Sequence, residues 1–422
     1  MFQKTDKIGN CRWRILALFF FATTINYIDR QVIGILKPYI SSDLGWSETD
    51  YGYIVTAFQI AYAIGLVSTG RFLDKFGTRL GYLWAIVVWS VAAMTHAVAR
   101  TVSGFAAARF ALGIGESANF PAAVKGVAEW FPKKERAFAA GLFNSGSTIG
   151  AIAAPIIVSA ITLALGWKMA FIITGSLGFI WIIFWILFYR IPEKHKNISK
   201  KELEYIRQDK DEKVPDSNIR WLCLFKYKQT ITICTTRFIS DWVWWFFLFW
   251  TPDFLNKTHG INIKELVLPL IIIYSVSSIG GIGGGWISSK MIEKGYGVDK
   301  SRKRTILICA LLVLPVFFVA YTSNLWIAVL LISLAAAGHQ GWASNIFTLV
   351  SDIYPKNAIG SMMGLSGFTG AIGGALSAYF VGLVLEATNS YSLLFAVASA
   401  IYLVNWAVIR LFIKKVEPII LN

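Results

Sequence analysis

Long apolar stretches alternate with short charged clusters along the whole chain. Six of the stretches contain no Asp, Glu, Lys or Arg: Leu80–Ala99, Ala137–Trp167, Met169–Tyr189, Thr305–Ser351, Asn357–Leu385 and Ala387–Ile409. Each is long enough to cross a hydrocarbon core of ~30 Å, which takes about 20 helical residues. The longest, Thr305–Ser351, can cross twice, with a turn near residues 322–324. Uniformly apolar runs lack the alternation of barrel strands, so the spans are predicted to be helices.

The pattern predicts an all-α membrane protein with twelve transmembrane helices. The predicted spans are residues 15–36, 51–70, 80–99, 101–124, 137–160, 169–189, 229–250, 266–288, 305–322, 325–350, 357–385 and 390–409. The first apolar stretch is too long for the core of a signal peptide and contains Asp29 and Arg30, so it is expected to be retained as a helix.

Composition excludes a soluble protein of 422 residues. Apolar residues make up 56% of the chain and charged residues 15%, with 17 Trp and 30 Phe, and a soluble surface needs more charge. The four cysteines show no metal or disulfide spacing, so neither a metal nor a cofactor is expected. No nucleophile–base spacing is visible, and an enzyme is not expected.

The placement of Lys and Arg predicts the orientation in the membrane. One set of loops, which includes both chain ends, holds 31 of the 40 Lys and Arg residues, and the opposite set holds five. Positive charge gathers on the cytoplasmic side, so both termini are predicted to be cytoplasmic. This placement also accounts for the net charge of +16, and no nucleic-acid partner is expected.

A repeat divides the chain into two related halves. Phe131-Pro132-Lys133, Gly141-Leu142 and Ile149-Gly150 recur, with a constant offset of 223 residues, as Tyr354-Pro355-Lys356, Gly364-Leu365 and Ile372-Gly373. We therefore predict a six-helix half at residues 1–189, a cytoplasmic linker at 190–228 and a second six-helix half at 229–422. Parallel halves of this kind hold their substrate site between them, near the midplane. Within the linker, Ser199-Lys-Lys-Glu202 is a capping box and predicts a short surface helix.

The loop between the second and third spans has the pattern Gly-x-x-x-Asp-(Arg/Lys)-x-Gly-x-(Arg/Lys), the signature of the major facilitator superfamily. It reads Gly70-Arg-Phe-Leu-Asp74-Lys75-Phe-Gly77-Thr-Arg79. A tight turn is expected at Gly77, and Asp74 is predicted to face a helix N-terminus and the basic residues as a conformational latch. The corresponding loop of the second half has Ser289 in place of the acid, so the latch is expected to be asymmetric.

Charged residues inside the spans are the strongest functional signal. They are Asp29, Arg30, Arg109, Glu116, Arg237 and Asp241. Each costs about 2.5–3.5 kcal/mol or more at the midplane, so pairing is expected. Arg109 and Glu116 are two helical turns apart on one face, and Arg237 and Asp241 are spaced to pair within one helix, which leaves open a structural salt bridge there.

Further polar residues lie in the predicted spans. The candidates are Asn26, Tyr27, Tyr62, Asn119, Asn144, Ser145, Ser147, His339, Gln340, Asn345, Ser366 and Thr369. The 223-residue offset places His339 opposite Glu116, and both a hydrogen-bonding and a proton-carrying role stay open for it. Four tryptophans crowd residues 242–250, and one of them is a candidate for stacking on a sugar ring.

Three segments resemble the anion:cation symporter family over almost the whole chain. They are Asn26-Tyr27-Ile28-Asp29-Arg30, the signature loop, and Arg109–Pro121 followed by Glu129–Arg136. Within that family the chain looks most like the bacterial hexuronate (glucuronate/galacturonate) transporters, on Phe143-Asn144-Ser145-Gly146-Ser147, Arg237 with Asp241, and His339-Gln340. The galactonate branch typically has Gln at the position of Ser147 and Asn at that of Gly367.

The resemblance implies proton symport of a small organic anion. It implies that Asp29 and Glu116 take protons and that Arg30 and Arg109 bind the substrate carboxylate. Tyr27, Tyr62, Asn119, Asn144, Ser147, His339 and Gln340 are the further substrate-binding candidates. The short first external loop, Lys37–Asp50, favours a bacterial inner membrane, and a monomer is expected.

Two alternatives stay open. One is a proton symporter for aldonates such as galactonate or for other organic anions. The other is a nutrient sensor with the same fold that moves no substrate; it is disfavoured because such sensors usually carry a long added cytoplasmic tail.

Overall fold

Each of the twelve predicted spans overlaps helical structure in the computed structural model, which describes residues 9–208 and 221–419. The first half contains α1 (Cys11–Leu44), α2 (Glu48–Thr95), α3 (Val102–Glu116), α4 (Asn119–Trp130), α5 (Lys133–Leu165) and α6 (Trp167–Phe188). The linker contains η1 (Pro192–Lys194), α7 (Lys200–Ile206) and α8 (Trp221–Leu224). The second half contains α9 (Lys228–His259), α10 (Ile263–Glu293), α11 (Val298–Val313), η2 (Leu314–Tyr321), α12 (Leu325–Ile353), α13 (Lys356–Thr388) and α14 (Ser392–Phe412). The described part of the chain contains no strand, so the all-α class is confirmed.

Nine helices of the described chain are long and apolar enough to cross a membrane. The remaining predicted spans, 15–36, 101–124 and 229–250, are the three that contain internal charged residues. These spans lie in α1, in α3 with α4, and in α9. Those helices are therefore not apolar enough, or not continuous enough, to meet the same criterion for crossing a membrane. These three are the elements in which a functional site is expected, because charge in a membrane helix is retained at a cost.

One predicted boundary is confirmed and one is wrong. The signature loop separates two spans as predicted, because α2 contains two candidate membrane spans, Glu48–Leu73 and Lys75–Thr95, and bends at Gly77, whose φ is 72° and ψ 160°. The predicted span at 101–124 is broken at residues 117–118 into α3 and α4. Pro121 explains this break, since it has no N–H to donate to the carbonyl of Ser117 four residues earlier.

The repeat predicted from sequence is visible in the helices themselves. Helices α5 and α13 each have 33 residues and begin and end with the same offset of 223 residues. Their N-caps, Pro132 and Pro355, have nearly identical backbone angles, φ of −64° and −63° with ψ of 154° in both. Each half therefore contains one copy of the same unit.

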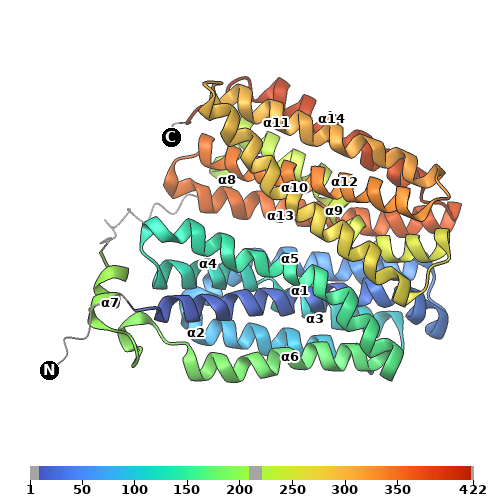
Figure 1. Cartoon of the computed structure of the whole chain (residues 1–422), viewed down its shortest axis with the longest axis horizontal. Helices are drawn as coiled ribbons and strands as arrows, with labels where there is room; N and C mark the ends of the chain where they lie inside the picture. Colours follow the sequence, from blue (N-terminus) through green and yellow to red (C-terminus); the bar gives the residue numbers. More distant parts are fainter. Residues whose placement is uncertain (1–8, 209–220, 420–422) are drawn as a thin grey trace.

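The helices form two groups that lie side by side (Figure 1), with α1–α6 in one and α9–α14 in the other. Between the groups, α2 packs on α13, α5 on α10 and α1 on α9. The start of α1 and the end of α14 lie at one end of the molecule, here called the terminal end. The turn at Gly45 lies at the other, called the opposite end. The two-half architecture agrees with the prediction, while the domain boundaries at 189/190 and 228/229 stay predictions.

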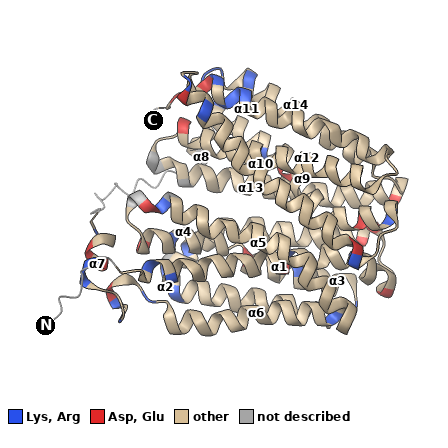
Figure 2. Ribbon diagram, in the orientation of Figure 1, with Lys and Arg blue, Asp and Glu red and all other residues tan. Residues whose placement is uncertain are grey.

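Charged residues gather at the two ends of the helices (Figure 2). Lys and Arg are concentrated at the terminal end, around α7, the starts of α1 and α11 and the end of α14 (Figure 2). A smaller mixed cluster of acids and bases lies at the opposite end. This asymmetry is the one that the loop counts predict.

The predicted linker helix is present as α7, and it is attached to the first half. Ser199 caps it by accepting a hydrogen bond from the N–H of Glu202, 3.1 Å away. The Glu202 carboxylate does not close the predicted capping box. It accepts instead from the backbone N–H of Arg12 at 3.0 Å, and the Arg12 guanidinium lies 3.0 Å from Glu135 of α5. Arg12 therefore joins α7, α1 and α5.

Candidate functional site

The centre of the site is an ion pair between α1 and α3. Both Nε and Nη2 of Arg30 lie 2.8 Å from one carboxylate oxygen of Glu116, and Nη2 also donates to Asn26 Oδ1 at 3.2 Å. Arg30 is 3% exposed and Glu116 is fully buried. Glu116 is the last residue of α3, so the break caused by Pro121 follows directly after it.

Aromatic rings surround the Arg30 guanidinium. Its carbon lies 4.9 Å from the ring centres of Tyr27 and Tyr62, 5.4 Å from Phe58 and 5.5 Å from Trp245. A guanidinium at these distances is attracted by the faces of the rings. Since Trp245 comes from α9, the Arg30 site includes both halves of the molecule. Of the tryptophans of α9, Trp245 is therefore the one next to the predicted carboxylate ligand.

Arg109 is held differently from Arg30. Its Nη2 donates to the backbone carbonyl of Arg30 at 3.0 Å, and its guanidinium lies over Phe58 at 5.1 Å and over Phe249 of α9 at 5.6 Å. Its buried Nε has no hydrogen-bond partner among the described residues. Arg109 is 1% exposed, so this donor is sealed from solvent while lacking an acceptor.

Asp29 is placed beside this cluster but pairs with neither arginine. Both of its carboxylate oxygens are buried, and neither has a hydrogen-bond partner among the described residues. Pairing was expected for the charged residues of the spans, and in this cluster it is found among the described residues only between Glu116 and Arg30. An unpaired carboxylate in such surroundings is costly, and a proton on Asp29 would remove that cost.

The remaining predicted binding residues fall into two groups. Tyr27 and Tyr62 contact Arg30, as described above. Asn119 instead bonds within the first half, accepting from Tyr82 at 2.5 Å and donating to Thr23 at 3.3 Å. On α5, Asn144 is exposed and Ser147 is half-buried, with the Ser147 hydroxyl donating to the carbonyl of Asn144 at 2.7 Å.

In the second half, the predicted candidates are engaged locally. His339 Nδ1 lies 2.6 Å from the hydroxyl of Tyr402, and its ring stacks on Trp244 with a centre-to-centre distance of 5.5 Å. Its neighbour Gln340 is half-buried. Arg237 and Asp241 pair within α9 as their spacing predicts, with Nη2 of Arg237 2.6 Å from the Asp241 carboxylate. These contacts are the ones expected of structural roles, and the structure does not bring them onto Arg30.

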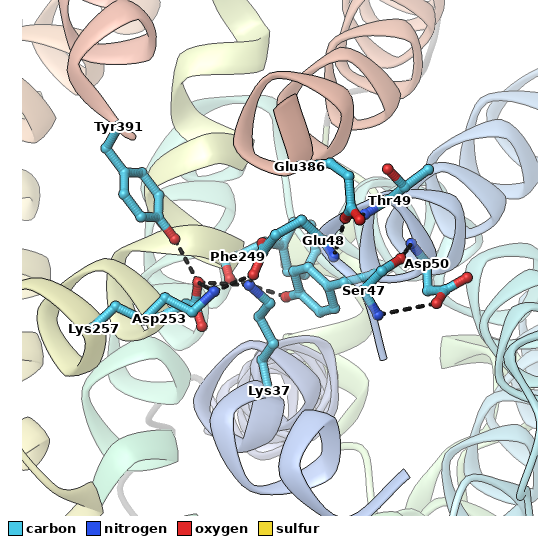
Figure 3. Close-up of polar contacts among 11 residues, drawn as sticks. Lys37, Ser47, Glu48, Thr49, Asp50, Phe249, Asp253, Lys257, Glu386 and Tyr391 are labelled. Atoms are coloured by element: carbon cyan, nitrogen blue, oxygen red, sulfur yellow. Dashed lines mark hydrogen bonds and ion pairs between the residues drawn. The ribbon is translucent and has the colours of Figure 1, made fainter. Parts of the chain in front are cut away.

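A second charged cluster closes the opposite end between the two halves (Figure 3). The buried Lys37 of α1 lies 2.5 Å from Asp253 of α9 and 2.6 Å from Glu48 of α2. Lys257, one turn after Asp253, pairs with Glu48 and lies 3.4 Å from Asp253. We call Lys37, Glu48, Asp253 and Lys257 the end cluster. It contains two residues from each half.

Two residues of the second half extend the end cluster. The hydroxyl of Tyr391 donates to Asp253 at 2.5 Å, and Glu386 of α13 accepts from the backbone N–H groups of Glu48 at 2.9 Å and Thr49 at 3.3 Å (Figure 3). Those N–H groups are the free donors at the start of α2, which favour a negative charge. Glu386 therefore binds the N-terminus of a helix in the other half.

The bonds between the halves continue inward from the end cluster. The Tyr51 hydroxyl donates to the carbonyl of Phe249 at 2.9 Å, and the Thr56 hydroxyl to that of Ala375 at 3.1 Å. Gly52 of α2 and Gly382 of α13 allow close contact, since a Cβ on Gly52 would lie 3.2 Å from the Cα of Gly382. The two halves are thus bonded together from the opposite end to Thr56, about two turns into α2.

Comparison with known proteins shows the family. The model of the Major Facilitator Superfamily matches residues 19–378 and 294–419.

The chain belongs to the Major Facilitator Superfamily.

Relatives within this superfamily agree with the resemblance read from the sequence. The chain is 33% identical over 414 residues to the hexuronate transporter of Escherichia coli K12, covering 96% of this chain and 95% of that one. It is 31% identical over 393 residues to the D-galactonate transporter of Escherichia coli O6:H1, covering 90% of each. The crystal structure of the D-xylose-proton symporter is 16% identical, with a TM-score of 0.75 over 96% of this chain and 99% of that one. Membership in a family of transporters confirms that the chain is not an enzyme.

The superfamily's signature loop is attached to its own half in this structure. Lys125 of α4 donates to the carbonyl of Leu73 at 3.0 Å, and Trp185 of α6 donates to the carbonyl of Arg79 at 2.9 Å. Gly77 makes the bend that the pattern predicts, while Gly70 has open space around it and Lys75 is exposed. The Asp74 side chain lies outside the described residues, so the latch stays a prediction.

Sequence reasoning missed the end cluster and the aromatic surroundings of the arginines. Lys37 and Lys257 were assigned to short loops, because charged residues mark the ends of apolar stretches. In the structure α1 continues to Leu44 and α9 to His259, so both lysines lie on helices. The spacing of Asp253 and Lys257, four residues apart, is the signal that could have shown a helical face there.

Proposed function

We propose that the protein is a secondary active transporter that imports a hexuronate, glucuronate or galacturonate, together with protons. The observation that carries this proposal is the Arg30–Glu116 pair, buried where α1, α2, α3 and α9 meet. A buried guanidinium whose partner is a titratable acid can exchange that acid for a substrate carboxylate. The similarity to hexuronate transporters supports the same substrate class.

The chemistry of the site fits a small sugar acid. Arginine presents a planar fork of donors that matches a carboxylate in two parallel hydrogen bonds. The rings of Tyr27, Tyr62 and Trp245 around Arg30 give flat surfaces on which a sugar ring can stack. We propose that Arg30 and Arg109 bind the carboxylate, and that these aromatic residues contact the body of the substrate.

The proposed coupling uses the same ion pair. In the empty carrier Glu116 holds Arg30, so proton uptake by Glu116 frees the guanidinium for the substrate anion. Proton and anion binding then favour each other, which is the reciprocity that symport requires. Asp29, buried and unpaired beside the cluster, is proposed as a second proton-binding residue.

We propose that the terminal end faces the cytoplasm of a bacterial inner membrane and that the protein works as a monomer. The concentration of Lys and Arg at this end supports the orientation (Figure 2). Because the halves are bonded together at the opposite end, this conformation corresponds to a carrier closed toward the outside. Transport then requires the end cluster to separate and the halves to rock about the central site.

A second candidate is a proton symporter for galactonate or another organic anion. It is favoured by the 31% identity to the D-galactonate transporter. Arginine recognition of a carboxylate is common to both candidates, so the polar residues that meet the rest of the substrate must decide between them.

The experiment that identifies the substrate is uptake of labelled glucuronate into energised membrane vesicles, with a panel of unlabelled competitors. Competition by glucuronate and galacturonate at concentrations well below those needed for galactonate is expected. Stronger competition by galactonate would favour the second candidate, and uptake unaffected by any sugar acid would refute the substrate class.

A further inference from the structure

A buried glutamine lies at the contact between the halves with no partner for its side chain. Gln59 of α2 is fully buried, and neither its Oε1 nor its Nε2 has a hydrogen-bond partner among the described residues. It lies eleven residues along α2 from Glu48, or about 16 Å at 1.5 Å per residue, which is close to mid-membrane. A carboxamide can make four hydrogen bonds, so this position leaves all of that capacity unused.

Gln59 faces the other half. Gly52, Thr56 and Gln59 recur at the spacing of one helix face, and the first two contact α13 as described above. A Cβ on Gly374 of α13 would lie 3.5 Å from Cδ of Gln59. Gln59 is therefore covered by α13 only while the opposite end is closed. When the halves separate there, the carboxamide is uncovered on the path to the central site.

The same glycine links Gln59 to the arginine site. A Cβ on Gly374 would lie 2.9 Å from Cδ1 and 3.2 Å from Nε1 of Trp245, whose ring is 5.5 Å from the Arg30 guanidinium. Tyr62, which also contacts Arg30, follows Gln59 by three residues on α2. Gly374 thus lies against both Trp245 and Gln59, and Trp245 in turn lies beside Arg30.

We propose that Gln59 binds the hydroxyl groups of the substrate, at the end away from the carboxylate. The inference rests on the proposed function and adds a residue that distinguishes polyhydroxylated acids from other organic anions. A hydroxyl both donates and accepts, so it complements a carboxamide that offers a carbonyl oxygen and an amide donor. Gly374 contributes by having no side chain, because any Cβ there would press against Trp245.

The lack of a hydrogen-bond partner for Gln59 also affects the conformational equilibrium of the empty carrier. A buried polar group without a partner destabilises the state in which it is buried. The cost falls on the conformation closed at the opposite end without substrate, and a bound hydroxyl removes it. Binding of a polyhydroxylated acid therefore favours closure around the substrate, which an anion without hydroxyls cannot do.

The test is Gln59→Met, which keeps the length of the side chain and removes its hydrogen-bonding groups. We expect the apparent affinity for glucuronate to fall roughly tenfold, the equivalent of one well-made hydrogen bond with its partner left unpaired. The inhibition constant of cyclohexanecarboxylate, which has a ring and a carboxylate but no hydroxyls, should stay unchanged. Thermal stability of the purified variant should be equal to or above that of the wild type, since an unpaired buried group has been replaced by an apolar one.

The control is Ser90→Ala. The hydroxyl of Ser90 is also fully buried and unpartnered among the described residues, but it faces α6 inside the first half, where a Cβ on Gly178 would clash with it. Glucuronate affinity should be unaffected by this change. Unchanged glucuronate affinity in Gln59→Met would overturn the inference, and so would an equal loss for cyclohexanecarboxylate or a loss of thermal stability.

Failure of the proposed function gives a different result. If the wild type takes up no uronate, the substrate proposal is wrong whatever Gln59 does. The comparison is then repeated with the acid that the competition panel identifies. A hydroxylated acid should lose affinity in Gln59→Met, whereas an unchanged affinity for such an acid would refute the inference independently.

Discussion

At the scale of single residues, Arg30 and Arg109 have the same charge but different surroundings. Arg30 has a carboxylate, an amide oxygen and four aromatic rings around it, whereas Arg109 donates to a backbone carbonyl and keeps Nε unpaired. A buried unpaired donor costs about 1–3 kcal/mol. An acceptor that reaches Nε would recover that cost, which supports the proposal that Arg109 binds a substrate oxygen.

Arg109→Lys should lose most transport although its charge is retained. An ammonium is a compact donor that cannot reproduce the planar fork of the guanidinium, so a carboxylate is no longer held by two parallel bonds. Apparent affinity and initial rate of uronate uptake measure the effect, with a combined loss of roughly tenfold or more expected from the loss of one charged hydrogen bond. The exposed Arg100→Lys is the control and should behave as the wild type. Near-normal affinity in Arg109→Lys would assign Arg109 to structure.

Glu116→Gln should separate binding from coupling. Glutamine resembles the protonated acid permanently, so Arg30 stays available and substrate should still bind and exchange across the membrane. The empty carrier cannot release a proton and restore the ion pair, so net accumulation should fail. Counterflow and proton-driven accumulation in proteoliposomes measure the two steps, with the exposed Glu204→Gln of α7 as control.

Either of two results would count against Glu116 as the coupling residue. Normal accumulation by Glu116→Gln would exclude it and direct attention to Asp29. Loss of exchange together with accumulation would indicate a structural role for the Arg30–Glu116 pair.

Most of these residues could be found in the sequence, and their partners could not. Asp29, Arg30, Arg109 and Glu116 stand out because charge is rare in apolar stretches. The sequence cannot tell which acid meets which arginine, because the choice depends on the rotation of α1 against α3. Gln59 was overlooked for a related reason: an uncharged amide is unremarkable until its burial and lack of a partner are known.

At the scale of helices, the contacts that the sequence did not predict lie mainly at the helix ends. Apolar stretches predicted the spans, but α1, α2 and α9 extend beyond them with polar residues. These extensions contain Lys37, Glu48, Asp253 and Lys257, so the end cluster was hidden by assigning its members to loops. The break after Glu116 was missed because it depends on local geometry, whereas the bend at Gly77 was predicted.

Lys37→Met should weaken closure at the opposite end. It leaves Asp253 and Glu48 close together with only Lys257 between them, and removing one partner of a buried ion pair costs about 3–5 kcal/mol. The acids regain water when this end opens, so the cost falls on the closed state alone. An adjoining cavity of about 390 Å³, lined in part by Glu48, Lys257 and Tyr391, provides a route for that water.

The change can be measured as a distance between spin labels at Ser42 and Thr388, one on each half at the opposite end. The distribution should gain a longer component in Lys37→Met. The control is Lys168→Met, which removes an exposed lysine at the same end that lies over the ring of its neighbour Trp167. This change should leave the distances unchanged. An unaltered distribution in Lys37→Met would show that the end cluster does not hold this end closed.

At the scale of the whole molecule, the two halves and their repeat could be predicted well from sequence. The offset of 223 residues holds for both ends of α5 and α13, because each helix starts after the same Pro and packs in the equivalent place. How far the halves are apart at each end could not be predicted, since the same sequence must support more than one arrangement. The arrangement in this structure is held by contacts between residues far apart in the sequence, such as Lys37 with Asp253, 216 positions apart, and Lys257 with Glu48, 209 positions apart.

The orientation predicts which loops can be labelled from outside. Lys200→Cys on α7, in a background without the native cysteines, should be unreactive toward a membrane-impermeant thiol reagent in intact cells. Lys264→Cys, exposed at the opposite end, should react and serves as the control. Reaction of Lys200→Cys in intact cells would reverse the proposed topology.

Uptake driven by an imposed proton gradient tests the central claim most directly. Purified protein in proteoliposomes, acidic outside and alkaline inside, should accumulate labelled glucuronate or galacturonate transiently above its equilibrium level. A protonophore should abolish the excess, and a sodium gradient at equal pH should produce none. Uptake that follows sodium, or that never exceeds equilibrium under a proton gradient, would contradict proton-coupled uronate transport.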